Sequence, residues 1–157
     1  MVKEILIVDD EADIRMLTSG ILEDEGYKTR KAGKSDDAIT ALKSRRPDLV
    51  LLDIWLQGSD LDGLQVLRQI KHLNVGIPVL MMSGHGTIET AVAAIKEGAY
   101  DFIEKPFKAD RLLLIVERAL EAAELRRENL ALRFRAGPEL DLIGTSREIK
   151  DIQQVIE

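Results

Sequence analysis

The chain has 157 residues, of which 45% are hydrophobic and 32% charged, with a net charge of −6 and no cysteine. This size fits one ordinary domain plus a remnant with a packed core. The negative charge argues against direct binding to a nucleic-acid backbone, and the missing cysteine excludes disulfides and thiol catalysis. With no basic leader and no run approaching ~18 apolar residues, we expect a cytoplasmic protein without a membrane segment.

Short apolar runs alternate with helical periodicity. Buried strands are predicted near residues 4–9, 48–53, 77–82 and 100–104, and a weaker one over 27–31. Gly26 and Gly98 stand where helices between these strands would end. The repeated strand–helix alternation predicts an α/β fold whose parallel sheet is covered on both faces. The apolar positions marking the first four helices are Ile14, Leu17 and Ile21; Ala38, Ile39 and Leu42; Leu64, Leu67 and Ile70; and Ile88, Ala91, Val92 and Ile95.

A fifth helix is predicted to begin near Ala109 and to end at Ala136-Gly137-Pro138. Thr145 and Glu148 then form a capping box that opens a new helical face. The sequence ends inside that face, so we expect a piece of a longer protein. Apolar residues of the fifth helix are spaced as a heptad seam that is interrupted by one arginine. The seam consists of Leu113, Val116, Leu120, Ala123, Arg127, Leu130 and Phe134.

Three carboxylates and one lysine follow apolar strands. Asp9 and Asp10 come after the first run, Asp53 after the third and Lys105 after the fifth. In an open α/β sheet these strand ends meet where ligands bind. Oxygen ligands suit Mg²⁺, an aspartate can take up a phosphoryl group, and Lys105 can hold a phosphoryl oxygen. The alternatives are that Asp10 caps the first helix, that Asp53 is a surface residue, and that Lys105-Pro106 is a plain turn.

Ser83 and Phe102 lie on the two neighbouring predicted strands. The Ser83 hydroxyl, beside Gly84, can donate to a phosphoryl oxygen, or it can cap the fourth helix. Phe102 can swing inward as Ser83 moves, or it can simply pack in the core. Pro106 favours a cis bond that would aim Lys105 inward. His72 and His85 are too isolated for a metal site, and no Walker-type loop occurs.

Together these residues resemble the receiver domain of two-component response regulators, over residues 1–123. The resemblance rests on Asp9-Asp10, Asp53, Ser83-Gly84, the stretch from Gly98 to Phe102, and Lys105-Pro106-Phe107. It implies a doubly wound, flavodoxin-like parallel sheet of five strands in the order 2-1-3-4-5. It also implies that Asp53 accepts phosphate from a sensor histidine kinase and that Lys105 contacts this phosphate. The implied Mg²⁺ ligands are Asp10, Asp53 and the Trp55 carbonyl, with Asp9 assisting, and Ser83 and Phe102 form the implied switch pair.

Leu142-Ile143-Gly144-Thr145-Ser146 and the helix predicted after them resemble the opening of the central ATPase domain of sigma-54-dependent, nitrogen-regulator-C-type regulators. Residues 124–138 are expected to form a helical linker or dimerisation segment, and residues 139–157 the start of a central AAA+ ATPase domain. Leu56-Gln57 stands where receivers commonly carry Met-Pro. The loop before Gly63 is longer than usual, and we expect it over the metal site. The stretch Asp53-Ile54-Trp55-Leu56-Gln57-Gly58-Ser59 most resembles the NtrX branch of this group.

The expected function is a phosphoacceptor switch rather than an enzyme. Phosphorylation would bias a homodimer formed through the fourth helix, fifth strand and fifth helix, or through the C-terminal helix. DNA and sigma-54 polymerase would be partners of the full-length protein and not of this chain. The alternatives are a degenerate receiver that serves only for dimerisation, and a phosphohydrolase, for which Asp53-Ile54-Trp55 lacks a second acid.

Overall fold

The computed structural model describes residues 2–56, 62–74, 76–84 and 88–143, and the side chains up to residue 129. The chain divides into two units, Met1–Ala123 and Glu124–Glu157, which are considered separately. No helix within the described ranges has the length and apolar character to cross a membrane. The predicted loop over the metal site, His85, and the capping box at Thr145 lie outside the described residues.

The first unit is built on a parallel sheet of five strands in the order β2-β1-β3-β4-β5. This confirms the predicted fold and strand order. β1 and β3 are neighbours, with Val8 opposite Leu52, so their carboxyl ends lie side by side. The chain order reverses between these two strands, and ligand sites form at such a point. The strands are β1 (Glu4–Val8), β2 (Lys28–Ala32), β3 (Leu49–Asp53), β4 (Val79–Ser83) and β5 (Asp101–Glu104).

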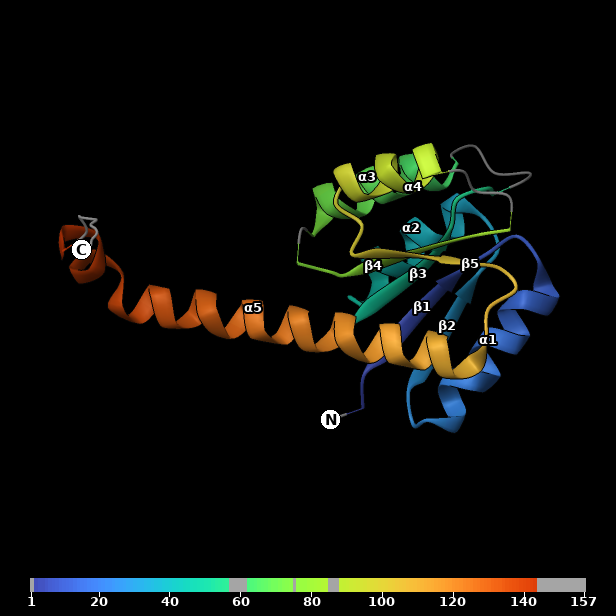
Figure 1. The fold of residues 1–157 in the computed structure, drawn as a ribbon, viewed down its shortest axis with the longest axis horizontal. Helices are drawn as coiled ribbons and strands as arrows, with labels where there is room; N and C mark the ends of the chain where they lie inside the picture. The colour runs from blue at the N-terminus through green and yellow to red at the C-terminus, as the bar shows by residue number, and fades with distance from the viewer. Residues whose placement is uncertain (1, 57–61, 75, 85–87, 144–157) are drawn as a thin grey trace. The chain divides into compact units, whose positions relative to one another are not determined.

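Helices cover both faces of the sheet (Figure 1). Alternate strand residues pack in the two cores on opposite faces. Leu6 and Val8 of β1 pack in one core with α2, α3 and α4, while Ile5 and Ile7 pack in the other core with α1 and α5. Burial on both faces explains why β1, β3 and β4 are continuous apolar runs. The helices are α1 (Ala12–Asp24), α2 (Ser35–Ser44), α3 (Gly63–Leu73), α4 (Ile88–Lys96) and α5 (Ala109–Ile143).

Helix α1 turns a different face to the sheet from the one that its apolar residues mark. It buries Thr18, Ser19 and Leu22, whereas Leu17 is 56% exposed. The hydroxyl groups of Ser19 and Thr29 are 2.7 Å apart and hydrogen-bonded, which satisfies a polar group at the edge strand. Periodicity therefore located this helix correctly but did not predict which side faces the core.

Helix α4 shows the same effect more strongly. Its buried residue is Ala94, while Ile88 is 84% exposed and Val92 and Ile95 are about half exposed. A small residue at the contact lets the helix lie close to the sheet. The apolar stripe is thus left on the surface of the first unit.

The predicted end of the last helix at Ala136-Gly137-Pro138 is wrong, because α5 continues to Ile143. A proline inside a helix removes one backbone hydrogen bond and costs about 3 kcal/mol, but it does not force the helix to end. Earlier in α5, Val116, Leu120 and Ala123 of the heptad seam are buried in the first unit's own core, and Arg127 is exposed.

Candidate functional site

The acid pair lies at the carboxyl end of β1. Asp9 is fully buried, its N–H donates to the Ala32 carbonyl at 3.1 Å, and its Oδ1 accepts from the Glu11 N–H at 2.9 Å. Asp10 is half-buried, and Glu11 rather than Asp10 is the N-cap residue of α1. The alternative that Asp10 caps the first helix is therefore wrong.

Asp53 is the last residue of β3 and is only 4% exposed. The backbone that follows it is fixed by the Ile54 N–H, which donates to the Met82 carbonyl at 2.9 Å. The Trp55 N–H donates to Asp53 Oδ1 at 3.3 Å. Asp53 is thus an oriented and nearly buried carboxylate rather than a surface residue.

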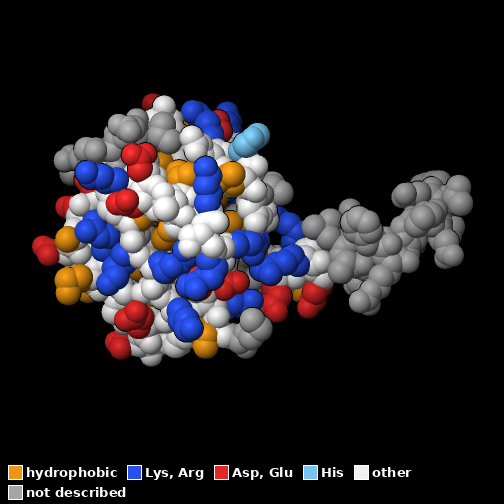
Figure 2. Space-filling view, turned by 180° about the vertical axis from the view of Figure 1, so that it is seen from behind, with side chains coloured by type: hydrophobic (Ala, Val, Ile, Leu, Met, Phe, Trp, Pro, Cys, Tyr) orange, Lys and Arg blue, Asp and Glu red, His pale blue; other side chains and the backbone are white. Residues whose placement is uncertain are grey.

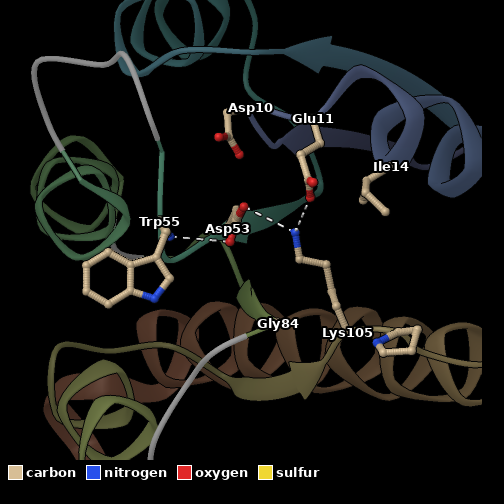
Figure 3. Close-up of a pocket in the computed structure, with 8 residues that line it drawn as sticks. Asp10, Glu11, Ile14, Asp53, Trp55, Gly84 and Lys105 are labelled. Carbon is tan, nitrogen blue, oxygen red and sulfur yellow. Dashed lines mark hydrogen bonds and ion pairs between the residues drawn. The ribbon is translucent and has the colours of Figure 1, made fainter.

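Lys105 reaches this carboxylate from the end of β5 (Figure 3). Its backbone N–H donates to the Ser83 carbonyl at 2.8 Å, and the peptide bond to Pro106 is cis, as predicted. Its Nζ donates to Asp9 Oδ2 at 2.9 Å and to Asp53 Oδ2 at 3.2 Å. One ammonium group therefore bridges two carboxylates that come from different strands.

Asp9, Asp10 and Asp53 each offer an oxygen within 4.8 Å of the others. Three carboxylates and no softer ligand make a donor set that suits a small hard cation such as Mg²⁺. Such a cation would also offset the repulsion between the three negative charges. The residues that the structure brings together therefore fit the expected metal.

The electrostatics follow from this crowding. Burial, and next the charge of Asp9, raise the pKa of Asp53 to about 7, although Lys105 and the Trp55 N–H act in the opposite direction. Burial acts to lower the pKa of Lys105. The hydrogen bond to Asp9 and the charges of Asp53 and Asp9 outweigh it, so the pKa of Lys105 stays above its ordinary value.

Ser83 and Phe102 lie on neighbouring strands, as predicted. Ser83 is the last residue of β4 and is fully buried. Phe102 is partly buried against the core beneath α2, α3 and α4. Met81, rather than Ser83, is its register partner on β4.

Three residues near the site were not predicted from the sequence to act there. Glu11 is the third carboxylate partner of Lys105, at 3.5 Å from Nζ. Arg15 Nη1 donates to the Asp9 backbone carbonyl at 2.6 Å and so fixes the end of β1. The position of Glu11 directly after the acid pair was a usable signal, whereas the contact of Arg15 depends on the packing of α1.

Gly63, the third, brings the first turn of α3 against the backbone of the site. A Cβ at this position would lie 2.2 Å from the Asp53 carbonyl oxygen and 2.6 Å from that of Ile54. The Gly63 N–H donates to the Ile54 carbonyl at 2.8 Å, and Asp62 and Gln65 form a capping box on the same turn. Because the opposing atoms are backbone, no side-chain rotation could relieve the contact.

The side chains open into a cavity of about 460 Å³. Its acidic wall and Lys105 face the same space, while the indole of Trp55 points away from Asp53 (Figure 3). A cavity with a nucleophilic carboxylate, a hard-cation site and a fixed ammonium group can take up a phosphoryl group. It is lined by Asp10, Glu11, Ile14, Asp53, Trp55, Gly84, Lys105 and Pro106.

Comparison with known proteins agrees with this chemistry. Residues 5–117 match the family described as the response regulator receiver domain. The whole chain is 55% identical to the nitrogen assimilation regulatory protein NtrX of Azorhizobium caulinodans, and it covers 34% of that protein. The chain thus spans about a third of the length of the curated relatives that it matches.

Two solved structures extend the likeness to the fold. The receiver domain of NtrX from Brucella abortus is 65% identical with a TM-score of 0.73, and the match covers 74% of this chain and 98% of that one. The beryllofluoride-activated receiver domain dimer of NtrC4 is 39% identical with a TM-score of 0.73. That match covers 78% of this chain and 99% of the other.

Replacing Gly63 by alanine should damage the site as well as the fold. The new Cβ would push the Asp53–Ile54 backbone away, so we expect Mg²⁺ affinity to fall at least about tenfold and stability by about 1–3 kcal/mol. Fluorescence of Trp55, the sole tryptophan, reports metal binding, and urea unfolding reports stability. The matched control is Gly20→Ala, where a Cβ meets nothing within 4 Å. Unchanged Mg²⁺ affinity in folded Gly63→Ala would refute the positioning role.

The raised pKa of Asp53 predicts a pH-dependent cost to metal-free stability. Its pKa of about 7 in the folded state exceeds the ordinary aspartate pKa of 3.8, so between these pH values the folded state binds a proton that the unfolded state does not. The free energy of unfolding therefore falls as pH rises through this window. The measurement is urea unfolding in EDTA. The free energy of unfolding of Asp53→Asn, relative to that of wild type, should be higher at pH 8 than at pH 5. An equal difference at both pH values would contradict the raised pKa.

Proposed function

The chain belongs to the response regulator receiver domain family, and from this premise we propose that Asp53 is the residue that accepts the phosphoryl group. The observation that carries the proposal is the position of its carboxylate. It stands at the end of β3, beside two further carboxylates and 3.2 Å from the ammonium of Lys105. Receivers are phosphorylated by sensor kinases, and a sensor histidine kinase is the donor that we propose here.

In the transfer step an oxygen of Asp53 attacks phosphorus on the phosphohistidine. The new P–O bond forms as the P–N bond breaks, and the electron pair of that bond stays on the imidazole nitrogen. Lys105 stabilises charge on the transferred oxygens, and the Trp55 N–H orients the attacking carboxylate. A bound Mg²⁺, held by Asp10, Asp53 and the Trp55 carbonyl with Asp9 assisting, would supply further charge neutralisation.

We propose that Ser83 and Phe102 change position in response to the negative charge of the phosphoryl group. The phosphoryl oxygens would draw the Ser83 hydroxyl toward them, and Phe102 on the neighbouring strand would then turn inward. Two features support this pairing. The Ser83 carbonyl is bonded to the Lys105 N–H at 2.8 Å, and Phe102 is only partly buried, which leaves it room to repack. The outcome is a change in the surface around α4 and β5.

The surface that changes is proposed to form a homodimer. Exposed apolar side chains lie on α4, just before β5 at Tyr100, and on α5 at Leu114. An apolar stripe of this kind is typical of a protein contact. Up to Ala123, the heptad seam of α5 packs in the core of the first unit. Any coiled-coil contact would therefore use the part of α5 beyond that residue.

The wider organisation is likewise a proposal. Residues 1–123 would be the receiver, residues 124–138 a helical linker or dimerisation segment, and residues 139–157 the start of a central AAA+ ATPase domain. DNA and sigma-54 polymerase would be partners of the full-length regulator. In that arrangement Asp53 phosphorylation controls output through dimer geometry.

Asp53→Asn should abolish phosphorylation. We expect wild type to take up one phosphoryl group per chain in Mg²⁺, by intact mass spectrometry, and to show a Trp55 response to beryllofluoride that the variant lacks. Asp37→Asn, on the exposed first turn of α2, is the matched control. Uptake by Asp53→Asn would refute the assignment. Silence of folded wild type would indicate a degenerate receiver, and repeated turnover of a phosphomonoester would indicate a phosphohydrolase.

Val92→Asp should weaken the dimer of the beryllofluoride-loaded protein at least about tenfold, because the contact would bury an unpaired carboxylate. Sedimentation equilibrium on wild type and variant measures this. Leu73→Asp on α3 is the control, since Leu73 is 49% and Val92 46% exposed. Equal dimer affinity in wild type and Val92→Asp would exclude α4 from the interface.

A further inference from the structure

The ammonium of Lys105 contacts three carboxylates, and one of these lies outside the acid cluster. Nζ lies 2.9 Å from Asp9, 3.2 Å from Asp53 and 3.5 Å from Glu11. Asp9 and Asp53 belong to the acid cluster that fits a divalent cation, whereas Glu11 does not. Asp9 and Asp53 are nearly buried, while the Glu11 side chain is 62% exposed at the mouth of the cavity.

The ammonium of Lys105 and a divalent cation would compete for the carboxylates of Asp9 and Asp53. Lys105 occupies Oδ2 of Asp9 and Oδ2 of Asp53, and a cation in the cluster needs oxygens of these residues. The two positive charges would also repel each other at such short range. A cation entering the cluster would therefore weaken the contacts of Lys105 with Asp9 and Asp53, and the ammonium would need another partner.

We propose that Glu11 is this partner: a positioning residue that takes over the Lys105 ammonium as Asp9 and Asp53 turn to the cation. The Glu11 backbone is anchored, because its N–H donates to Asp9 Oδ1 at 2.9 Å. Its exposed side chain can move with the ammonium, and it already points toward Lys105 from the α1 side of the cavity (Figure 3).

This inference rests on the proposed function, in which Lys105 stabilises charge on the transferred phosphoryl group. Without Glu11, a displaced Lys105 would find its next partners in solvent. With Glu11, the ammonium stays at the cavity mouth, where an incoming phosphoryl group needs a positive charge. Glu11 would thus couple metal binding to the position of the Lys105 ammonium, through a contact that exists before phosphorylation.

A double-mutant cycle tests this coupling in the full chain, with Mg²⁺ as the probe and Trp55 fluorescence as the readout. Glu11→Gln should raise the Mg²⁺ Kd about two- to fivefold, as expected for an exposed ion pair. Lys105→Met should lower the Kd, because the competing ammonium is gone. In the Lys105→Met background, Glu11→Gln should have an effect at least about twofold smaller, since only its direct attraction to the cation is then lost.

Asp13→Asn is the matched control, since Asp13 is an exposed acid in the first turn of α1 and does not line the cavity. It should leave the Kd nearly unchanged, and the urea midpoint of Glu11→Gln in EDTA should equal that of wild type. An equal effect of Glu11→Gln with and without Lys105 would overturn the proposal while leaving the Mg²⁺ site standing. A wild type that does not respond to Mg²⁺ would instead overturn the proposed function.

Discussion

The ammonium of Lys105 between buried carboxylates is the interaction on which the rest of this site depends. Asp9 and Asp53 sit almost out of water on neighbouring strands, and like charges cannot be gathered there without a cation. Lys105 supplies that cation from a third strand, β5. The ammonium of Lys105 therefore holds these carboxylates together, and in the exchange proposed above a divalent cation would rearrange this network.

The sheet places these groups with little freedom. The central strands β1, β3 and β4 are held in register by their neighbours and buried on both faces, so the backbone at their carboxyl ends is fixed to the core. Gly63 adds a constraint by bringing α3 against the Asp53 backbone. The proposed movements are therefore movements of side chains, those of Ser83, Phe102 and Glu11 among them, on a fixed backbone. A rigid frame with a few movable side chains suits a two-state switch.

The helices show what sequence periodicity could predict and what it could not. It located α1 and α4, because apolar residues at helical spacing occur in both. It did not predict the buried faces: Ser19 is buried through its bond to Thr29, and α4 contacts the sheet through Ala94. An apolar stripe can serve either the core or a partner, and the sequence does not distinguish the two uses. For α4, the exposed stripe is the proposed dimer surface.

The sequence by itself determined the strands, the strand-end acids, the lysine and the cis Pro106, because apolar runs and residue types are local properties. Only the tertiary structure decided that Lys105 is shared with Glu11, that Arg15 fixes the Asp9 carbonyl, and that Gly63 touches the Asp53 backbone. It also carried α5 beyond Pro138 to Ile143. These outcomes depend on distances between elements far apart in the chain, and local periodicity contains no such distances.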